Sequence, residues 1–206
     1  MEFKANFVIV DCETGGLKST DNPIVEICVI AINNNLEDIG LYSSIIAPYG
    51  NYQITQGALN ANGMTLEQIK SGKPSDQVIA ELIDFLRPLK MGREKPILCG
   101  HNIDHFDIPF IDEFFTFHKK KVSDYFNDKF TIDTLWWSRV AWQESTNYQL
   151  ATACFNAGIE LVNAHRAETD TNANKDLVKY FLKNLRGEGM SKDKVQEERF
   201  RSTFQF

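Results

Sequence analysis

The order of strand-like and helix-like segments is the feature that most constrains the fold of this chain. Five segments of strand character lie at 6–11, 24–32, 36–47, 96–99 and 130–133. Asn33-Asn34-Asn35 predicts a hairpin turn between the second and third, because asparagine tolerates a left-handed backbone. The later strands alternate with segments of helical periodicity. Hairpins first and strand–helix alternation afterwards predict an α/β fold with a mixed sheet covered by helices.

Caps and apolar spacing place the helices. Thr65 and Gln68 form a capping-box pattern that predicts a helix start, and the stretch between the third strand and Thr65 is expected to be a loop. Further helices are expected at 74–89, 107–117, 135–142, 148–157 and 169–185. Gly187 suits the left-handed cap that ends the last of them.

Composition and length indicate one domain, at 1–185, followed by a tail at 186–206. The chain has 206 residues, 43% of them hydrophobic, which is enough for a sizeable core. The longest apolar stretch, 24–32, is too short to cross a bilayer, and the first residues are not leader-like. The four widely spaced cysteines fit a reducing compartment. We therefore expect a cytoplasmic protein without a membrane segment.

Two carboxylates follow the first strand at a spacing of two residues. Side chains two apart on a strand point the same way, so Asp11 and Glu13 project together while Cys12 points into the core. Carboxylates this close repel one another unless a cation lies between them. The pattern predicts a metal site at the strand end; a polar strand end with two unrelated acids is the simpler alternative.

A second acidic signature, Asn102-Ile103-Asp104-His105-Phe106-Asp107, follows the fourth strand. Asp107 lies at the expected start of a helix, from which its carboxylate can reach the same edge of the sheet. We prefer Asp107 to Asp104 as a metal ligand because apolar residues flank it and would anchor it. The alternative is an ordinary acid at a helix N-terminus, favoured by the helix dipole.

The third signature is His165-Arg166-Ala167-Glu168-Thr169-Asp170. Five residues correspond to about 140° around a helix, so His165 and Asp170 cannot share one helical face. We therefore place Asp170 on the final helix and His165 on the loop before it. A neutral histidine, with an ordinary pKa of about 6.5, can take a proton from water near pH 7. An ordinary exposed histidine is the alternative.

Together the signatures supply four carboxylates and one imidazole, an inventory suited to holding two divalent cations beside an attacking water. They predict a metal-dependent phosphodiesterase. The formal net charge of −6, from 28 acids and 22 bases, argues against a long non-specific nucleic-acid track. Two divalent ions would bring the charge to about −2 and concentrate positive charge at the site. We expect a short substrate footprint or help from a partner.

These segments resemble the DEDDh (DnaQ-like) family of 3′→5′ exonucleases, whose members include proofreading subunits, RNase T and oligoribonuclease. The resemblance covers roughly residues 5 to 185, and the His-x-Ala-x-x-Asp spacing marks the histidine branch. It implies a ribonuclease H-like fold, a mixed five-stranded sheet flanked by helices, with two Mg²⁺ or Mn²⁺ ions. By motif, the metal ligands would be Asp11, Glu13, Asp107 and Asp170, and His165 would be the general base.

The resemblance also bears on the substrate. Asn102 and Asp107 are five apart, closer to the mammalian three-prime repair exonucleases, which act on DNA, than to the bacterial proofreading pattern, which places them four apart. It implies release of nucleoside 5′-monophosphates from single-stranded 3′ ends, with DNA favoured and a proofreading or repair role. The tail would be a candidate for docking a polymerase or other replication or repair protein, or would fold back on the domain. An RNA-trimming exoribonuclease of the RNase T or oligoribonuclease type, and a catalytically inactive nucleic-acid-binding module, are the alternatives.

Substrate contacts are expected beside the acidic signatures. Thr14 and Gly15 follow Glu13 directly, and glycine lets a backbone approach a ligand closely. Leu17 is a candidate wedge against the terminal base, with a core leucine as the alternative. His101 and Asn102 would contact the substrate strand or cap the following helix.

Three tryptophans, Trp136, Trp137 and Trp142, are further candidates for substrate contact. An indole ring can stack on an unpaired base, an interaction of about 1–3 kcal/mol. Their helical spacing favours core packing for at least two of them.

Overall fold

The computed structural model describes residues 5–161 and 167–187. One sheet is formed by β1 (Phe7–Thr14), β2 (Ile24–Ile32), β3 (Asp38–Ile45), β4 (Ile97–Gly100) and β5 (Ile132–Asp133), in the order β3-β2-β1-β4-β5. β2 runs antiparallel to β1 and β3, whereas β4 is parallel to β1 and β5. The predicted mixed five-stranded sheet is confirmed.

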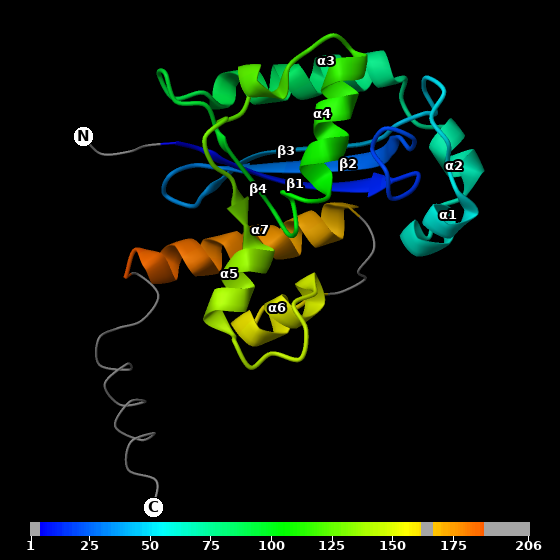
Figure 1. Ribbon diagram of the computed structural model, residues 1–206. Coiled ribbons are helices and arrows are strands. Elements are labelled where there is room, and N and C mark those ends of the chain that lie inside the picture. Colours follow the sequence, from blue (N-terminus) through cyan, green and yellow to red (C-terminus); the bar gives the residue numbers. More distant parts are fainter. Residues whose placement is uncertain (1–4, 162–166, 188–206) are drawn as a thin grey trace, which may run out of the picture.

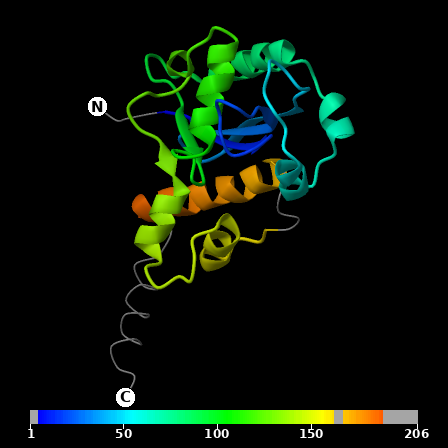
Figure 2. The same ribbon diagram turned by 45° about the vertical axis from the view of Figure 1, so that its right-hand side comes forward.

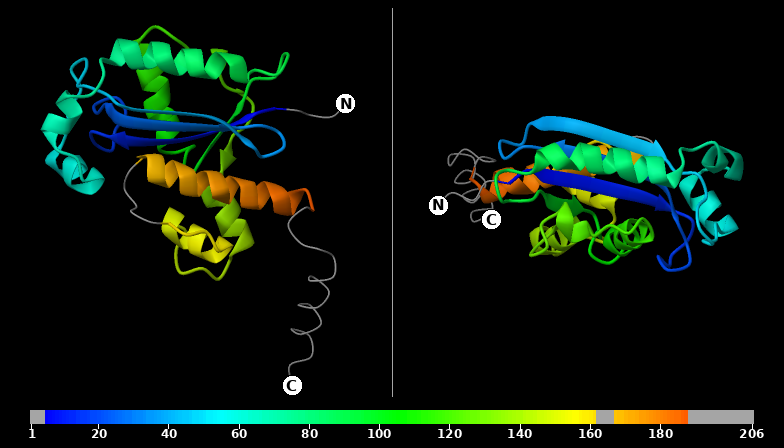
Figure 3. Two further views of the ribbon diagram at one scale, coloured as in Figure 1. Left: turned by 180° about the vertical axis from the view of Figure 1, so that it is seen from behind. Right: turned by 90° about the horizontal axis from the view of Figure 1, so that it is seen from above.

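Helices cover both faces of the sheet. α3 (Ser75–Leu86) and α4 (Asp107–Phe117) lie on one face, and α7 (Ala167–Leu185) lies along the other (Figure 1). α5 (Thr134–Ala141) and α6 (Leu150–Ala157) pack against α7, on its side away from the sheet (Figure 2). α1 (Gln56–Asn62) and α2 (Leu66–Lys70) lie beyond the end of the sheet toward which β1 points (Figure 3). Short 3₁₀ turns occupy Arg87–Leu89 and Val122–Asp124.

The alternation of side chains along β1 separates two cores. Val8, Val10 and Cys12 pack with apolar side chains of α3 and α4. Phe7 and Ile9 pack on the other face with Val178 and Leu182 of α7. Cys12 therefore points into the core, as predicted, and Asp11 and Glu13 continue the row that faces α7. Along β1, the side chains that face α7 thus change from apolar to acidic, whereas those on the other face stay apolar as far as Cys12.

α7 is the longest described helix, and it packs against β1 and β2 on one side. Its buried residues are mostly apolar but include Thr171 and Asn174. It begins at Ala167, two residues before the predicted start, so Asp170 lies in its first turn. Gly187 has a φ of 73° and caps the helix end as predicted. Within the described ranges, no helix combines the length and the apolar character needed to cross a membrane.

The hairpin between β2 and β3 departs from the prediction in one respect. The left-handed residue is Leu36, with a φ of 65°, and β3 therefore begins only at Asp38. The Asn33 side chain accepts hydrogen bonds from the backbone N–H groups of Asn35 and Glu37 and closes the turn. Leu36 is buried in the core beside α7, and that burial offsets a left-handed backbone cost of about 1–2 kcal/mol.

The prediction of a loop before Thr65 was wrong, because α1 lies within that stretch. Its signals are short-range: Thr55 accepts a hydrogen bond from the N–H of Ala58, and Gly63 ends the helix with a φ of 63°. Few apolar residues at helical spacing accompany these caps, so periodicity does not show the helix. α2 begins as predicted, with both hydrogen bonds of the capping box between Thr65 and Gln68.

Candidate active site

The site lies where β1 continues past the end of its parallel neighbour. β4 pairs with β1 only through Phe7, Val8 and Ile9, and the chain then leaves the sheet. Asp107, the first residue of α4, approaches this edge and accepts a hydrogen bond of 3.0 Å from the backbone N–H of Cys12. The buried carboxylate of Asp107 thus accepts the hydrogen bond from β1 that a longer β4 would otherwise accept.

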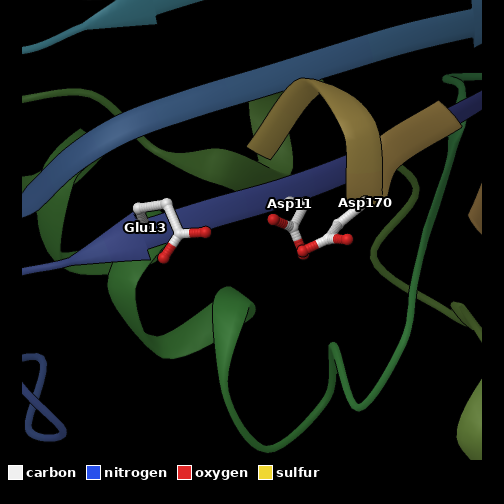
Figure 4. Close-up of side chains that lie close together, drawn as sticks. All are labelled: Asp11, Glu13 and Asp170. Carbon is white, nitrogen blue, oxygen red and sulfur yellow. The ribbon is translucent and has the colours of Figure 1, made fainter. Parts of the chain in front are cut away.

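Three other carboxylate side chains meet on the α7 side of β1. Asp11 and Glu13 project from the strand, and Asp170 projects from the first turn of α7 (Figure 4). One carboxylate oxygen from each lies within 4.8 Å of the others, all three residues being half-buried. Oxygen donors at this spacing suit a hard divalent cation, and the three side chains come from segments about 160 residues apart.

The electrostatics of the cluster fit a metal site. Burial raises the pKa of Asp11 well above its ordinary value, and the carboxylates of Asp107 and Glu13 raise it further. Burial also raises the pKa of Asp107 to about 7, although the N–H of Cys12 acts in the opposite direction. Acids gathered in this way repel one another when ionised, and a divalent cation removes that repulsion. The cluster is therefore suited to binding divalent metal.

Asp107 and Asp104, the two candidate metal ligands of the second acidic signature, have different environments. Asp107 is 3% exposed and lies against β1, as its apolar neighbours suggested. Asp104 is exposed, and its carboxylate accepts a hydrogen bond of 2.5 Å from the hydroxyl of Thr131. This contrast supports Asp107 as the fourth acid of the site, a role that stays a prediction. His165 lies outside the described residues, and its role as general base also stays a prediction.

A pocket of about 730 Å³ adjoins the carboxylates. Its lining joins the end of β1 and the following turn to α1 and the residue before α4: Cys12, Glu13, Thr14, Gly16, Leu17, Lys18, Asn22, Thr55, Gly57, Ala58, Ala61, Asn62 and Phe106. Glu13 belongs both to this pocket and to the metal cluster. Leu17 is 88% exposed, which excludes the alternative of a core leucine. Thr14 and Leu17 thus line the pocket, although the Thr14 hydroxyl donates to the carbonyl of Gly16, and contact of either residue with substrate stays a prediction.

Comparison with known proteins agrees with this geometry. The family model for RNase T, described as exonuclease, matches residues 8–178, most of the chain. The chain belongs to the RNase T exonuclease family. This is the DEDDh branch of the ribonuclease H-like superfamily that the three acidic signatures indicated.

Relatives of this RNase T-family chain are larger proteins. The PolC-type DNA polymerase III of Halalkalibacterium halodurans is 28% identical over 179 residues, covering 87% of the chain and 11% of the relative. The 3′-5′ exonuclease DinG of Staphylococcus aureus is 29% identical over 166 residues, covering 81% and 17%. E. coli exonuclease I, solved with a dT13 oligonucleotide, superposes with a TM-score of 0.73 at 19% identity, covering 87% of this chain and 41% of that one. The chain thus spans less than half of each of these proteins.

In this exonuclease domain, Gly15 lies in the turn after β1 with its backbone N–H and carbonyl both hydrogen-bonded. Its N–H donates to the carbonyl of Pro23 and its carbonyl accepts from the N–H of Thr55. A Cβ at this position would lie 2.6 Å from Pro23 Cδ, so only glycine fits. Gly15 thus closes the turn after β1 and holds the start of α1 beside it, and its contact with substrate stays a prediction.

His101 and Asn102 have internal partners as well. The ring nitrogens of His101 lie 3.0 Å from Thr134 Oγ1 and 2.8 Å from the carbonyl oxygen of Tyr148. Burial lowers the pKa of His101, which favours the neutral ring, with Nε2–H donating to that carbonyl. Asn102 adopts a left-handed φ of 63° and turns the chain toward α4. These contacts favour a positioning role for the His101 side chain, whereas the backbone of Asn102 shapes the loop and contact of its side chain with the substrate strand stays a prediction.

Asp133 is a positioning residue that the sequence argument missed. It is buried at the end of β5, and its Oδ1 accepts hydrogen bonds of 2.9 Å from the N–H groups of Asn102 and Leu135. Its Oδ2 lies 3.4 Å from the backbone nitrogen of Asp104. One carboxylate thus caps α5 and holds the loop that leads to Asp107. An acid directly before a helix is the signal that could have identified it.

We expect Asp133→Ala to lower the free energy of unfolding by about 1–3 kcal/mol, because partly buried N–H groups lose their acceptor. We also expect a lower kcat/KM, since the loop before Asp107 loses its anchor. Thermal unfolding and steady-state kinetics would measure the two effects. Asp128→Asn, at an exposed acid nearby, is the control. Wild-type stability and kcat/KM in Asp133→Ala would contradict the role.

Proposed function

We propose that this domain is a 3′→5′ exonuclease that releases nucleoside 5′-monophosphates from single-stranded 3′ ends, with DNA preferred and a proofreading or repair role. The observation that carries the proposal is the junction at Glu13 between the carboxylate cluster and the 730 Å³ pocket. A pocket of this size accepts one terminal nucleotide and brings its phosphodiester to the carboxylates. The names of the PolC and DinG relatives support this activity and a replication or repair polymerase as partner.

The four acids and His165 have separate roles in the proposed reaction. Asp11, Glu13 and Asp170 hold divalent metal, with Asp107, at the edge of β1 left open by β4, as a further ligand. Two bound Mg²⁺ or Mn²⁺ ions would supply an activated water and stabilise the charge that develops on the scissile phosphate. His165, two residues before α7, takes the proton from the attacking water and requires a neutral ring to do so.

The pocket walls suggest how a terminal nucleotide is held. Leu17 projects from the turn after β1, and Phe106 approaches from the loop before α4. The α1 wall presents small residues, Gly57, Ala58 and Ala61, which leave room for a planar base. Asn62 donates a hydrogen bond of 3.0 Å to the carbonyl of Thr14 and fixes α1 beside the site. We therefore assign base contact to Leu17 and Phe106.

Matched 5′-labelled single-stranded DNA and RNA oligomers, incubated with Mg²⁺ or Mn²⁺, test the proposal directly. We expect a stepwise ladder from the 3′ end, faster on DNA, that disappears with Asp11→Ala. Faster degradation of RNA would replace the DNA preference with RNA trimming. A folded protein that degrades neither substrate with either metal would refute the exonuclease and leave a binding module.

A further inference from the structure

A mixed aromatic and cationic surface lies beside the active-site loop, formed by His105, Trp136, Arg139 and Tyr148. We call it the α5 patch. The guanidinium of Arg139 lies 4.6 Å from the ring centroid of Trp136 and 5.8 Å from that of Tyr148. The ring of His105 contacts Trp136 edge-on, at 6.4 Å between centroids. Trp136 is nevertheless 44% exposed, and the side chains of His105 and Arg139 are exposed as well.

This tryptophan differs from the other two. Trp137 packs against Phe181 of α7, and Trp142 packs against Phe181 and Tyr180, so both belong to the core beneath α5, as their spacing predicted. Trp136 and Arg139 lie three apart on the opposite, solvent-facing side of α5. Core packing therefore explains two tryptophans and leaves Trp136 without a structural reason for its large apolar ring.

The α5 patch is continuous with the active site. His105 immediately precedes Phe106, which lines the nucleotide pocket, and Asp107, which contacts β1. The patch is also fixed to that loop, because Asp133 at the start of α5 binds the N–H of Asn102. On its other side, the carbonyl of Tyr148 lies 2.8 Å from Nε2 of His101. A strand leaving the pocket past Phe106 would thus meet a rigid surface.

The chemistry of the patch matches single-stranded nucleic acid. Exposed aromatic faces stack on bases of any sequence, and a guanidinium beside them binds a phosphate and stacks as well. Binding of this kind needs few positive charges, which agrees with a chain of formal net charge −6. A long track of lysines would be the alternative, and this composition does not favour it.

We propose that the α5 patch binds the single-stranded segment on the 5′ side of the scissile bond, with bases stacked on Trp136 and Tyr148 and a phosphate on Arg139. The proposal rests on the exonuclease function above and extends it: the substrate is an unpaired strand of several nucleotides, held by stacking. A duplex would not present its bases to these rings.

The test compares Trp136→Ala and Arg139→Ala with wild type on a dinucleotide and on an oligothymidylate of about 12 nucleotides. We expect KM for the long oligomer to rise about 5- to 50-fold with kcat unchanged, because stacking is lost at a site that a dinucleotide does not reach. KM for the dinucleotide should stay at the wild-type value. Trp136→Phe should recover most of the affinity, and Val140→Ala, at an exposed α5 residue outside the patch, is the control.

A binding measurement separates this proposal from the exonuclease function. Fluorescence anisotropy of the labelled oligothymidylate, measured in EDTA, requires no hydrolysis, and Trp136→Ala should raise Kd by the same factor. Arg139→Ala should also reduce the salt dependence of binding by about one phosphate contact. Unchanged Kd and KM in both folded variants would overturn the proposal, as would equal losses on the two substrate lengths. A binding defect in a protein that degrades nothing would support the patch and refute the exonuclease.

Discussion

Replacing Asp11 with asparagine is expected to reduce exonuclease turnover about 10³-fold or more while making the metal-free protein more stable. The loss of turnover follows because a ligand to catalytic metal is removed, and such metals contribute several kcal/mol to the transition state. The gain in stability follows because burial, and then the neighbouring acids, raise the pKa of Asp11 and so disfavour its charged form. An amide of the same shape relieves that repulsion.

Two measurements at about pH 8 check this prediction. Single-turnover kinetics should show the loss of activity, and thermal unfolding in EDTA should show a higher Tm for Asp11→Asn than for wild type. Addition of Mg²⁺ or Mn²⁺ should raise the Tm of wild type more than that of the variant. If Asp11→Asn lowered the Tm in EDTA, the carboxylates would not repel one another, and the cluster would not be a metal site.

The metal-free protein is expected to lose stability as the pH rises from about 4 to about 7. The folded state holds a proton on Asp107 with a pKa of about 7, whereas an unfolded aspartate has a pKa of about 3.9. The folded state therefore binds more protons in this interval, so stability falls as the pH rises and levels off above about 7. The total loss from this one group is of the order of 2–4 kcal/mol.

Thermal unfolding in EDTA across this pH range measures the effect, which for a chain of this size corresponds to about 5–10 °C in Tm. Asp107→Asn should flatten the profile, because the asparagine does not titrate. Asp112→Asn, at an exposed position of the same helix, should leave it unchanged. Divalent metal at pH 8 should restore most of the lost stability in wild type. A wild-type profile that rises between pH 4 and 7 would contradict the raised pKa of Asp107.

Local sequence patterns were sufficient for most elements. The apolar runs of β1 and β2, the face of α3 and the capping box at Thr65 each depend on residues close in the chain, and all were predicted correctly. α1 was missed because its evidence is only a pair of caps. The left-handed residue in the first hairpin was also misplaced, because burial of Leu36 against the core decided which residue took that conformation.

The sequence by itself determined the acids of the site. A spacing of two put Asp11 and Glu13 on one side of a strand, and the helical pattern put Asp170 on the last helix; the placement of His165 before that helix stays a prediction. Both inferences need only the period of the local backbone. The same reasoning could not show that the backbone of Gly15 bonds to Pro23 and Thr55, or that His101 is held by Thr134 and Tyr148.

Tertiary structure alone decided how those residues meet. Asp107 reaches β1 because β4 ends early and α4 begins at the open edge, and Asp170 reaches Asp11 because α7 packs across β1. The roles of Asp133 and of Trp136 likewise depend on contacts with the loop before α4, which is distant from β5 and α5 in the chain. Such contacts are set by how buried faces pack and where each strand stops, and no local period in the sequence records them.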